Sequence, residues 1–281
     1  MSYIWKSNVE TFIDTRKKSQ SVYKEDTEKL LRNTQVYRDA DIVIDDSELL
    51  VRNDMKIKIV AGGTVSTAYN IDDSNCRIAI LNFADAKRPG GWVKEGAPTQ
   101  EENICRCTNL YETLIQPFCK ANYYDVNLNA GIPDAEHHYD EPYTDALIYS
   151  EKVAIFKDDV TYKDIPVKYV DVITSPAPCG EVDDVEIVLM HRIRGIIKAA
   201  YLHGVTHIVL GAWGCGAFGQ NPKVVAKCFK RVLSAFPVFK VVIFAIRPTG
   251  VANKKFARDY VFDAFDRVFK QSLFLSESRE E

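Results

Sequence analysis

The sequence lacks any run of about 18 apolar residues, the minimum for a helix that spans a membrane. It also lacks an excess of positive charge, because its 36 Lys and Arg residues are offset by 39 Asp and Glu residues. The chain as a whole therefore has no positive field for nonspecific binding to nucleic acids or acidic membranes. Residues 1–10 are polar and lack the apolar stretch of a secretory signal. We expect no membrane partner and a cytoplasmic protein, or a nuclear one in a eukaryotic or viral host.

The sequence also lacks two pairs of Cys or His residues at the spacing of a structural metal site. The seven cysteines are an odd number scattered through the chain, which fits reduced thiols rather than a disulfide framework. Cys105 and Cys107 are separated by one residue, which is too short for the usual zinc-binding pair. The adjacent His137 and His138 have no second ligand pair at a suitable spacing. We expect no metal site and no cofactor.

Segments with the patterns of strands and helices alternate along the chain. Short apolar runs predict strands at residues 57–60, 77–81, 169–174, 206–210 and 241–246. Apolar residues at helical spacing predict helices at residues 4–32, 100–114, 184–203, 222–236 and 253–271. Residues 85–99 and 120–145 are rich in breakers or polar residues and predict loops. This alternation predicts an α/β protein with a mostly parallel sheet covered by helices on both sides.

Local signals define the domain and two helices more closely. There is no Pro/Gly/Ser-rich linker and no internal repeat, so we expect a single domain over residues 1–281, with a helical extension (1–50) and a core (57–271). Val9, Phe12 and Ile13 lie on one side of the first helix and predict its buried face. Asn221 can cap the helix of residues 222–236, and Pro222 suits its first position.

A glycine-rich turn at residues 211–219 separates a predicted strand from a predicted helix. Glycines let backbone N–H groups approach a ligand closely, and a helix start adds positive potential, so the turn suits a phosphate or diphosphate. The spacing also matches a dinucleotide fingerprint, Gly-x-Gly-x-x-Gly. A dinucleotide-binding fold, however, needs an acidic residue after the next strand, where this chain has Arg247. Anion binding is therefore favoured, and a turn that merely packs a strand on a helix is the alternative.

A second segment carries two glycines and two adjacent carboxylates, Glu101 and Glu102. Cleavage of a glycosidic bond needs a carboxylic acid to protonate the leaving oxygen. Neighbouring helical residues point about 100° apart, so these two should not form a facing pair. One could reach the scissile oxygen while the other holds a hydroxyl group. A helix start favours the ionised form, so an acid role needs burial or substrate to raise the pKa. A solvated pair without function is the alternative.

The two segments together resemble one known family. Residues 81–111, with Pro-Gly-Gly-Trp followed by Gln-Glu-Glu, resemble the bacterial-type poly(ADP-ribose) glycohydrolases, a branch of the macrodomain superfamily. Residues 209–219 resemble the diphosphate-binding loop of that family, and the likeness covers most of the chain from about residue 57. The resemblance implies a three-layer, macrodomain-like α/β fold, with a mostly parallel or mixed central sheet, helices on both faces and an N-terminal helical extension.

The resemblance also implies an activity and a set of site residues. The chain would hydrolyse ribose–ribose bonds of poly(ADP-ribose), release ADP-ribose and so reverse ADP-ribosylation. Glu102 would be the catalytic acid, Glu101 would hold ribose hydroxyls and Gln100 would help to set the loop. Residues near the ribose or the diphosphate would be Asn82, Gly90, Gly91, Gly214, Cys215, Gly216, Ala217, Phe218 and Gly219, with Phe218 also against the adenosine. Cys215 would contribute its backbone N–H, and its thiol would be a small packing group.

Two positions depart from the family pattern and leave alternatives open. Trp92 stands where the family has a third glycine, and Asp85 replaces an Asn or small polar residue. The chain could instead bind ADP-ribose without cleaving it, or remove ADP-ribose from a protein side chain or a nucleic-acid base. Nucleic acid enters only as such a modified substrate. Aromatic residues of the 120–145 segment could line a lid over the substrate, or be solvated: Tyr123, Tyr124, His137, His138, Tyr139 and Tyr143.

Overall fold

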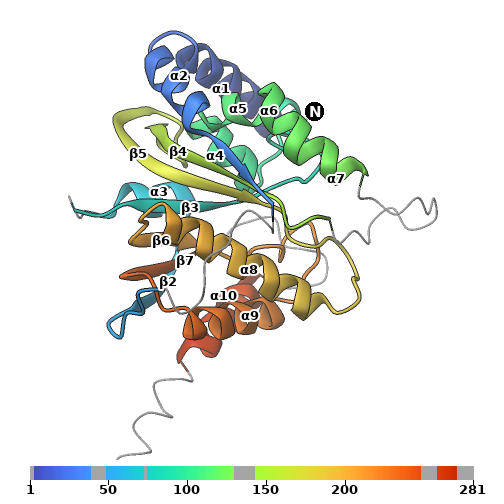
Figure 1. Ribbon diagram of the computed structural model, residues 1–281. Coiled ribbons are helices and arrows are strands. Elements are labelled where there is room, and N and C mark those ends of the chain that lie inside the picture. The colour runs from blue at the N-terminus through green and yellow to red at the C-terminus, as the bar shows by residue number, and fades with distance from the viewer. Residues whose placement is uncertain (1–2, 39–48, 73–74, 130–142, 248–257, 271–281) are drawn as a thin grey trace, which may run out of the picture.

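The computed structural model describes residues 3–38, 49–72, 75–129, 143–247 and 258–270, and it is built around one sheet of seven strands (Figure 1). The strand order is β1-β4-β5-β3-β6-β7-β2. From β5 to β2 all neighbours are parallel, whereas β4 runs antiparallel to both β5 and β1. The strands are β1 (Gln35–Tyr37), β2 (Lys56–Ala61), β3 (Ile78–Phe83), β4 (Leu147–Lys157), β5 (Asp164–Ser175), β6 (His207–Leu210) and β7 (Val241–Ile246).

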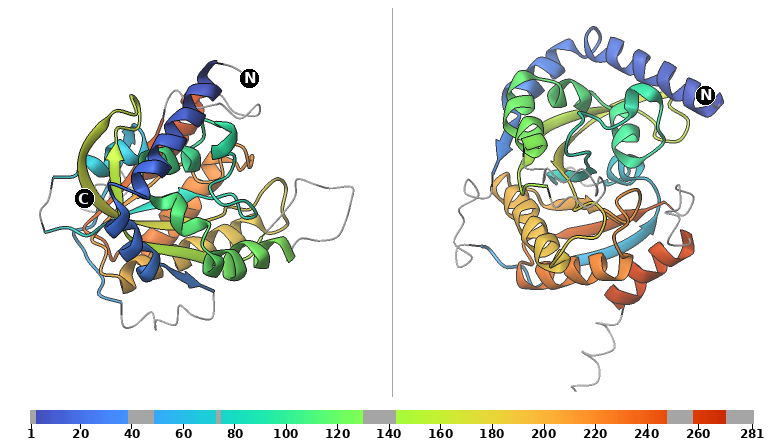
Figure 2. Two further views of the ribbon diagram at one scale, coloured as in Figure 1. Left: turned by 90° about the horizontal axis from the view of Figure 1, so that it is seen from above. Right: turned by 90° about the vertical axis from the view of Figure 1, so that its right-hand side faces the viewer.

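Helices cover both faces of this sheet, which makes three layers. One face is covered by α8 (Val185–Leu202), α9 (Pro222–Ala235) and α10 (Arg258–Lys270). The opposite layer is formed by α1 (Tyr3–Ser19), α2 (Lys24–Asn33), α3 (Thr64–Tyr69), α4 (Gln100–Cys107), α5 (Leu110–Leu114), α6 (Pro117–Cys119) and α7 (Asp125–Asn129), with short turns η3 (Val93–Glu95) and η4 (Lys120–Tyr124). Figure 2 shows the sheet between the two layers.

Side chains from both faces of the sheet are buried, as a sheet covered on both sides requires. In β3, Ala79 and Leu81 face the layer of α8–α10, and Ile78 and Ile80 face the opposite layer. The expected three-layer α/β fold with a mixed central sheet and an N-terminal helical segment is thus confirmed. No helix in the described ranges is long and apolar enough to cross a membrane.

Several local predictions need correction. The helix expected at residues 4–32 is two helices, and Ile13 of its expected buried face is 62% exposed, while Phe12 is buried. The helix expected at residues 100–114 breaks at Thr108, which forms a bridge to Ile155 in β4. Both breaks follow from tertiary contacts that local spacing does not reveal. The strands β1 and β4 were not predicted.

The loop expected at residues 120–145 is also partly wrong. Residues 120–129 are helical, and Tyr123 and Tyr124 are buried in the layer of α1–α7 rather than placed over a ligand. Asn127 connects α7 to Thr144, because its side-chain oxygen accepts from the Thr144 N–H at 2.8 Å. Of the expected lid residues, His137, His138 and Tyr139 lie outside the described residues.

Candidate active site

The two motif segments lie side by side at one edge of the sheet. Strands β3 and β6 are parallel neighbours, with Ile80 opposite Val209, so their carboxyl ends meet at the same edge. The loop after β6 packs closely against the end of β3. A Cβ atom added to Gly211 would lie only 2.8 Å from the Phe83 ring. The adjacency that the resemblance requires is therefore present.

Gln100, the first residue of α4, ties this helix to the end of β3. Its side-chain oxygen accepts from the Phe83 N–H at 2.9 Å, and its Nε2 donates to the Leu81 carbonyl at 2.7 Å. Nε2 also lies 3.1 Å from Thr64 Oγ1. Three contacts from one amide fix the first turn of α4 against the strand, so Gln100 is placed to set the position of the loop.

Glu101 is 3% exposed and its carboxylate is held by two donors. Asn82 Nδ2 donates to Oε1 at 3.2 Å, and the Asp85 N–H donates to Oε2 at 2.8 Å. Burial raises the pKa of Glu101 well above its usual range, and the neighbouring charge of Glu102 raises it further. Glu101 is therefore a carboxyl group that tends to keep its proton.

Glu102 is 4% exposed and bonds to the glycine turn. The Trp92 N–H donates to its Oε1 at 2.9 Å, and the Thr99 hydroxyl donates to Oε2. A Cβ at Gly91 would collide with Glu102 Oε1 and lie 3.1 Å from Glu101 Oε2. Both carboxylates thus converge on Gly91. The solvated alternative is wrong, because long side chains bring both groups to one turn despite their divergent Cα–Cβ directions.

Asn82 and Gly90 contact protein groups that surround the two carboxylates. Asn82 is fully buried, and its Nδ2 donates to Thr174 as well as to Glu101. Its Oδ1 has no partner among the described residues. Gly90 has φ +70°, and a Cβ there would lie 2.8 Å from the Tyr111 ring. The structure therefore shows Asn82 as a residue that positions Glu101, and Gly90 as a close-packed turn.

The loop after β6 exposes backbone amides. Within the described part of the chain, the amides of Gly216, Ala217 and Phe218 have no hydrogen-bond acceptor. The other two amides of this stretch are used internally: Cys215 donates to Ala212 and Gly219 donates to Gly216. Three consecutive N–H groups without an acceptor are the kind of donors that an anion requires, and we refer to them as the amide cradle.

The flanks of this loop are fixed by packing and by a helix cap. A Cβ at Gly214 would lie 2.7 Å from Ala177, so this glycine is needed for the turn itself. Burial raises the pKa of the Cys215 thiol, whose side chain is 3% exposed, so the thiol packs inward as expected. Asn221 Oδ1 accepts from the Lys223 N–H at 3.0 Å, which confirms the predicted cap of α9. Phe218 is half-buried, with its ring 6.1 Å from that of Tyr143.

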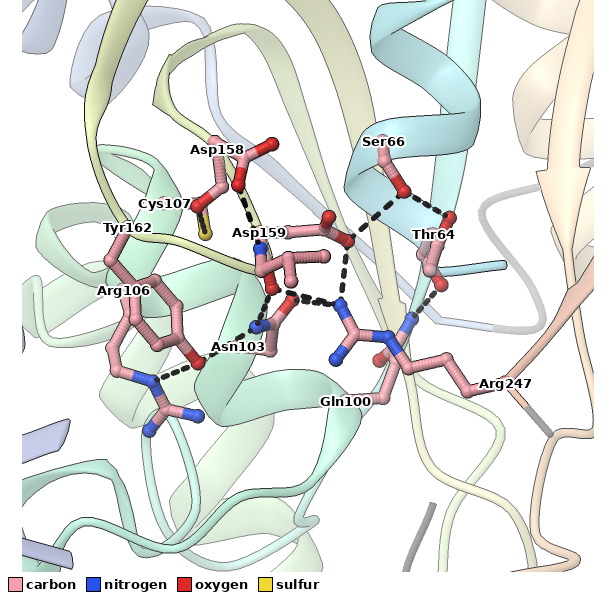
Figure 3. Close-up of polar contacts among 12 residues, drawn as sticks. Thr64, Ser66, Gln100, Asn103, Arg106, Cys107, Asp158, Asp159, Tyr162 and Arg247 are labelled. Atoms are coloured by element: carbon pink, nitrogen blue, oxygen red, sulfur yellow. Dashed lines mark hydrogen bonds and ion pairs between the residues drawn. The ribbon is translucent and has the colours of Figure 1, made fainter. Parts of the chain in front are cut away.

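A further cluster of polar side chains supports α4 through Asn103 (Figure 3). Arg247 Nη2 lies 2.7 Å from Asp159 Oδ2, whose side chain is fully buried, and Ser66 Oγ lies 3.3 Å from the same oxygen. Asn103, which follows Glu102, donates to the Asp159 carbonyl at 3.1 Å. The sequence analysis did not find this pair, because nothing in the sequence connects residues that are 88 positions apart.

The N-terminal helix α1 closes the remaining side of the loop. Asn8 Nδ2 donates to the Gly96 carbonyl at 2.9 Å, and a Cβ at Gly96 would collide with the Trp5 backbone oxygen. Thr15 Oγ1 donates to the carbonyl of Arg106 in α4 at 2.5 Å. The N-terminal segment is thus part of the support of the site. In the described ranges, no three His, Cys, Asp or Glu residues are grouped to hold a metal ion.

A three-layer α/β domain with a cradle of backbone amides beside a buried pair of glutamates defines the class of protein. Residues 7–158 match the family model of the microbial-type poly(ADP-ribose) glycohydrolase (PARG) catalytic domain, so the chain belongs to this family of glycohydrolases. A comparison with curated proteins gave no significant match.

Solved structures of the family have the same fold. A PARG from Thermomonospora curvata is 26% identical, covers 94% of this chain and 99% of its own, and has a TM-score of 0.79. The same protein bound to the inhibitor ADP-HPD is 27% identical, covers 93% of this chain and 98% of its own, and has a TM-score of 0.77. A PARG from Deinococcus radiodurans in complex with ADP-ribose is 28% identical, covers 87% of this chain and 97% of its own, and has a TM-score of 0.72.

Proposed function

We propose that this protein hydrolyses ribose–ribose O-glycosidic bonds of poly(ADP-ribose) and releases ADP-ribose, with Glu102 as the general acid. The observation that carries the proposal is the convergence of the buried Glu101 and Glu102 carboxylates on Gly91, beside the free amides that follow β6. Membership of a glycohydrolase family supports the reaction class. The buried acidic pair also favours a hydrolase over a module that only binds ADP-ribose.

The amide cradle is the anchor of the proposed complex. The N–H groups of Gly216, Ala217 and Phe218 bind the diphosphate, and the Phe218 ring lies against the adenosine. Binding energy from these distant parts holds the anomeric carbon beside the glutamates. Because the diphosphate is anionic, it also stabilises the positive charge that develops at the anomeric carbon in the transition state.

The buried pair supplies the proton. Two adjacent carboxyl groups in a site removed from water do not both ionise readily, and the raised pKa of Glu101 reflects this. In the proposed reaction the single proton of the pair passes to Glu102, which transfers it to the leaving ribose oxygen as the C–O bond breaks. Water then adds to the anomeric carbon, and its proton returns to Glu102. Glu101 holds ribose hydroxyls through the remaining hydrogen-bonding capacity of its carboxyl group.

The test is the variant Glu102→Gln, which keeps the size of the side chain and one acceptor oxygen for the Trp92 N–H. We expect its calorimetric affinity for ADP-ribose to stay within about threefold, and turnover of labelled polymer to fall by about 10²–10⁴-fold. The matched control is Glu95→Gln, an exposed glutamate in η3 of the same loop, with unchanged turnover. Comparable rates in Glu102→Gln and the control would contradict the role of Glu102.

A substrate panel separates the acceptor classes. The wild-type protein is incubated with poly(ADP-ribose), with an ADP-ribosylated serine peptide and with an ADP-ribosylated oligonucleotide. Release of ADP-ribose from the polymer is the expected result. Release from only the peptide or the oligonucleotide would keep the acidic pair and replace the proposed substrate.

A further inference from the structure

The two departures from the family pattern, Asp85 and Trp92, belong to one cluster with Arg88. Asp85 Oδ1 accepts from the backbone N–H of Lys87 at 2.8 Å and of Arg88 at 3.0 Å. The Arg88 guanidinium lies over the Trp92 ring, 3.9 Å from its centroid. The Asp85 carboxylate thus shapes the loop that presents Arg88 to Trp92.

The cluster is adjacent to the proposed acid. The backbone N–H of Trp92 donates to Glu102 Oε1 at 2.9 Å. The residue that carries the indole ring is therefore also the one that bonds to the proposed acid. The turn η3 begins at the next residue and leads to the Gly96 carbonyl, which is bonded to Asn8 of α1. The segment that follows Trp92 therefore leads from Glu102 to α1.

The start of the same loop lies on the other side, where the diphosphate cradle is. The Lys87 ammonium is 5.8 Å from the Tyr143 ring, and that ring is 6.1 Å from Phe218. If a substrate is anchored at Phe218 with its scissile bond at Glu102, we expect its leaving group near Trp92, because the Trp92 N–H bonds to that acid.

The chemistry of the cluster suits a nucleotide. The Trp92 side chain is 49% exposed, and Arg88 is exposed as well, so one face of a large ring with a cation beside it is open to a ligand. An indole ring stacks on a base, and a guanidinium binds phosphate oxygens through paired N–H donors. A leaving group that consists of ribose alone would use neither.

We propose that Arg88 and Trp92 form a subsite for the leaving group, which stacks the adenine and binds the diphosphate of the ADP-ribose unit next to the scissile bond. This inference rests on the proposed function, because it assigns the polymer side of the same cleft. It makes Trp92 and Arg88 specificity-determining residues that favour a polymer over a single ADP-ribose group on an amino acid.

The test compares two ligands in the Glu102→Gln background, where cleavage of the dimer should be about 10²–10⁴-fold slower. Calorimetry measures the affinity for ADP-ribose and for the dimer of two ADP-ribose units joined by the ribose–ribose bond. We expect the dimer to bind more tightly than the monomer. Adding Trp92→Ala should weaken dimer binding about 5- to 100-fold and change monomer binding by less than about twofold. Trp92→Phe, which keeps a stacking ring, should restore most of the dimer affinity.

Two further variants make the result specific. Arg88→Gln should weaken dimer binding and reduce its dependence on salt, because a phosphate contact is lost. Phe118→Ala removes an exposed aromatic ring of α6 and should change neither affinity. Equal affinities for dimer and monomer, or equal losses for both ligands in Trp92→Ala, would overturn the subsite. Absence of binding by either ligand would instead contradict the proposed function itself.

Discussion

Substituting alanine for Gly91 tests the arrangement of the two glutamates directly. Gly91 has φ +59°, and in this left-handed region a Cβ costs about 1–2 kcal/mol. The new methyl group would also collide with Glu102 Oε1. Nonbonded carbon and oxygen atoms approach to about 3.3 Å, so the carboxylate must move by about 1 Å. Loss of its hydrogen bond from Trp92 adds about 1–2 kcal/mol.

We therefore expect Gly91→Ala to lower the free energy of unfolding by about 2–4 kcal/mol and to lower polymer turnover by about 10²-fold, the effect of a misplacement of about 1 Å. Urea unfolding and release of labelled ADP-ribose measure the two quantities. The matched control is Gly204→Ala after α8, where φ is +69° but a Cβ would meet no atom within 4 Å. It should lose only the backbone component of stability and keep its turnover. If both variants had the same turnover, the proposed contact between Gly91 and the acid would be refuted.

Two other variants test the buried charges. Because the folded state raises the pKa of Glu101 above its ordinary 4.5, the folded protein binds this proton more tightly, and its stability falls as pH rises through that interval. Above pH 4.5, urea midpoints of Glu101→Gln should fall less with rising pH than those of the wild type; parallel profiles would contradict this. Arg247→Ala should cost about 1–3 kcal/mol of unfolding free energy, since the buried Asp159 loses its cation. Removing the exposed Arg267, which pairs with Asp263, should cost less than about 0.5 kcal/mol, and equal losses would refute the difference.

Elements with a strong local pattern could be predicted from the sequence. The strands β2, β3, β6 and β7 carry short apolar runs, and α8 and α9 carry helical spacing, so each was found within a few residues. The strand β4 was missed because its polar centre at Ser150, Glu151 and Lys152 interrupts the pattern, and pairing with β5 decides its structure. Residues 120–129 were misjudged by composition, although their two tyrosines are core residues.

The residues of the candidate site also divide into those that the sequence could predict and those that it could not. The residue types at positions 100–102 were enough to predict two neighbouring carboxylates, which the structure shows buried together. Those at positions 214–219 predict an anion site, which stays a prediction. The partners of these residues were not predictable. Asp159 follows β4 and Arg247 follows β7, and both support α4 from segments far away in the sequence. The stacking of Arg88 on Trp92 depends on how Asp85 folds the intervening loop.

Three successive side chains of α4 reach three successive parts of the chain. Gln100 bonds to the end of β3, Glu101 to the Asp85 N–H and Glu102 to the Trp92 N–H. The same residues that perform the proposed chemistry therefore also fold the loop over it. One hydrogen bond, from the Trp92 N–H to Glu102 Oε1, joins the proposed acid to the cluster of Arg88 and Trp92. The placement of the acid and the placement of the proposed subsite are thereby linked, because this bond belongs to both.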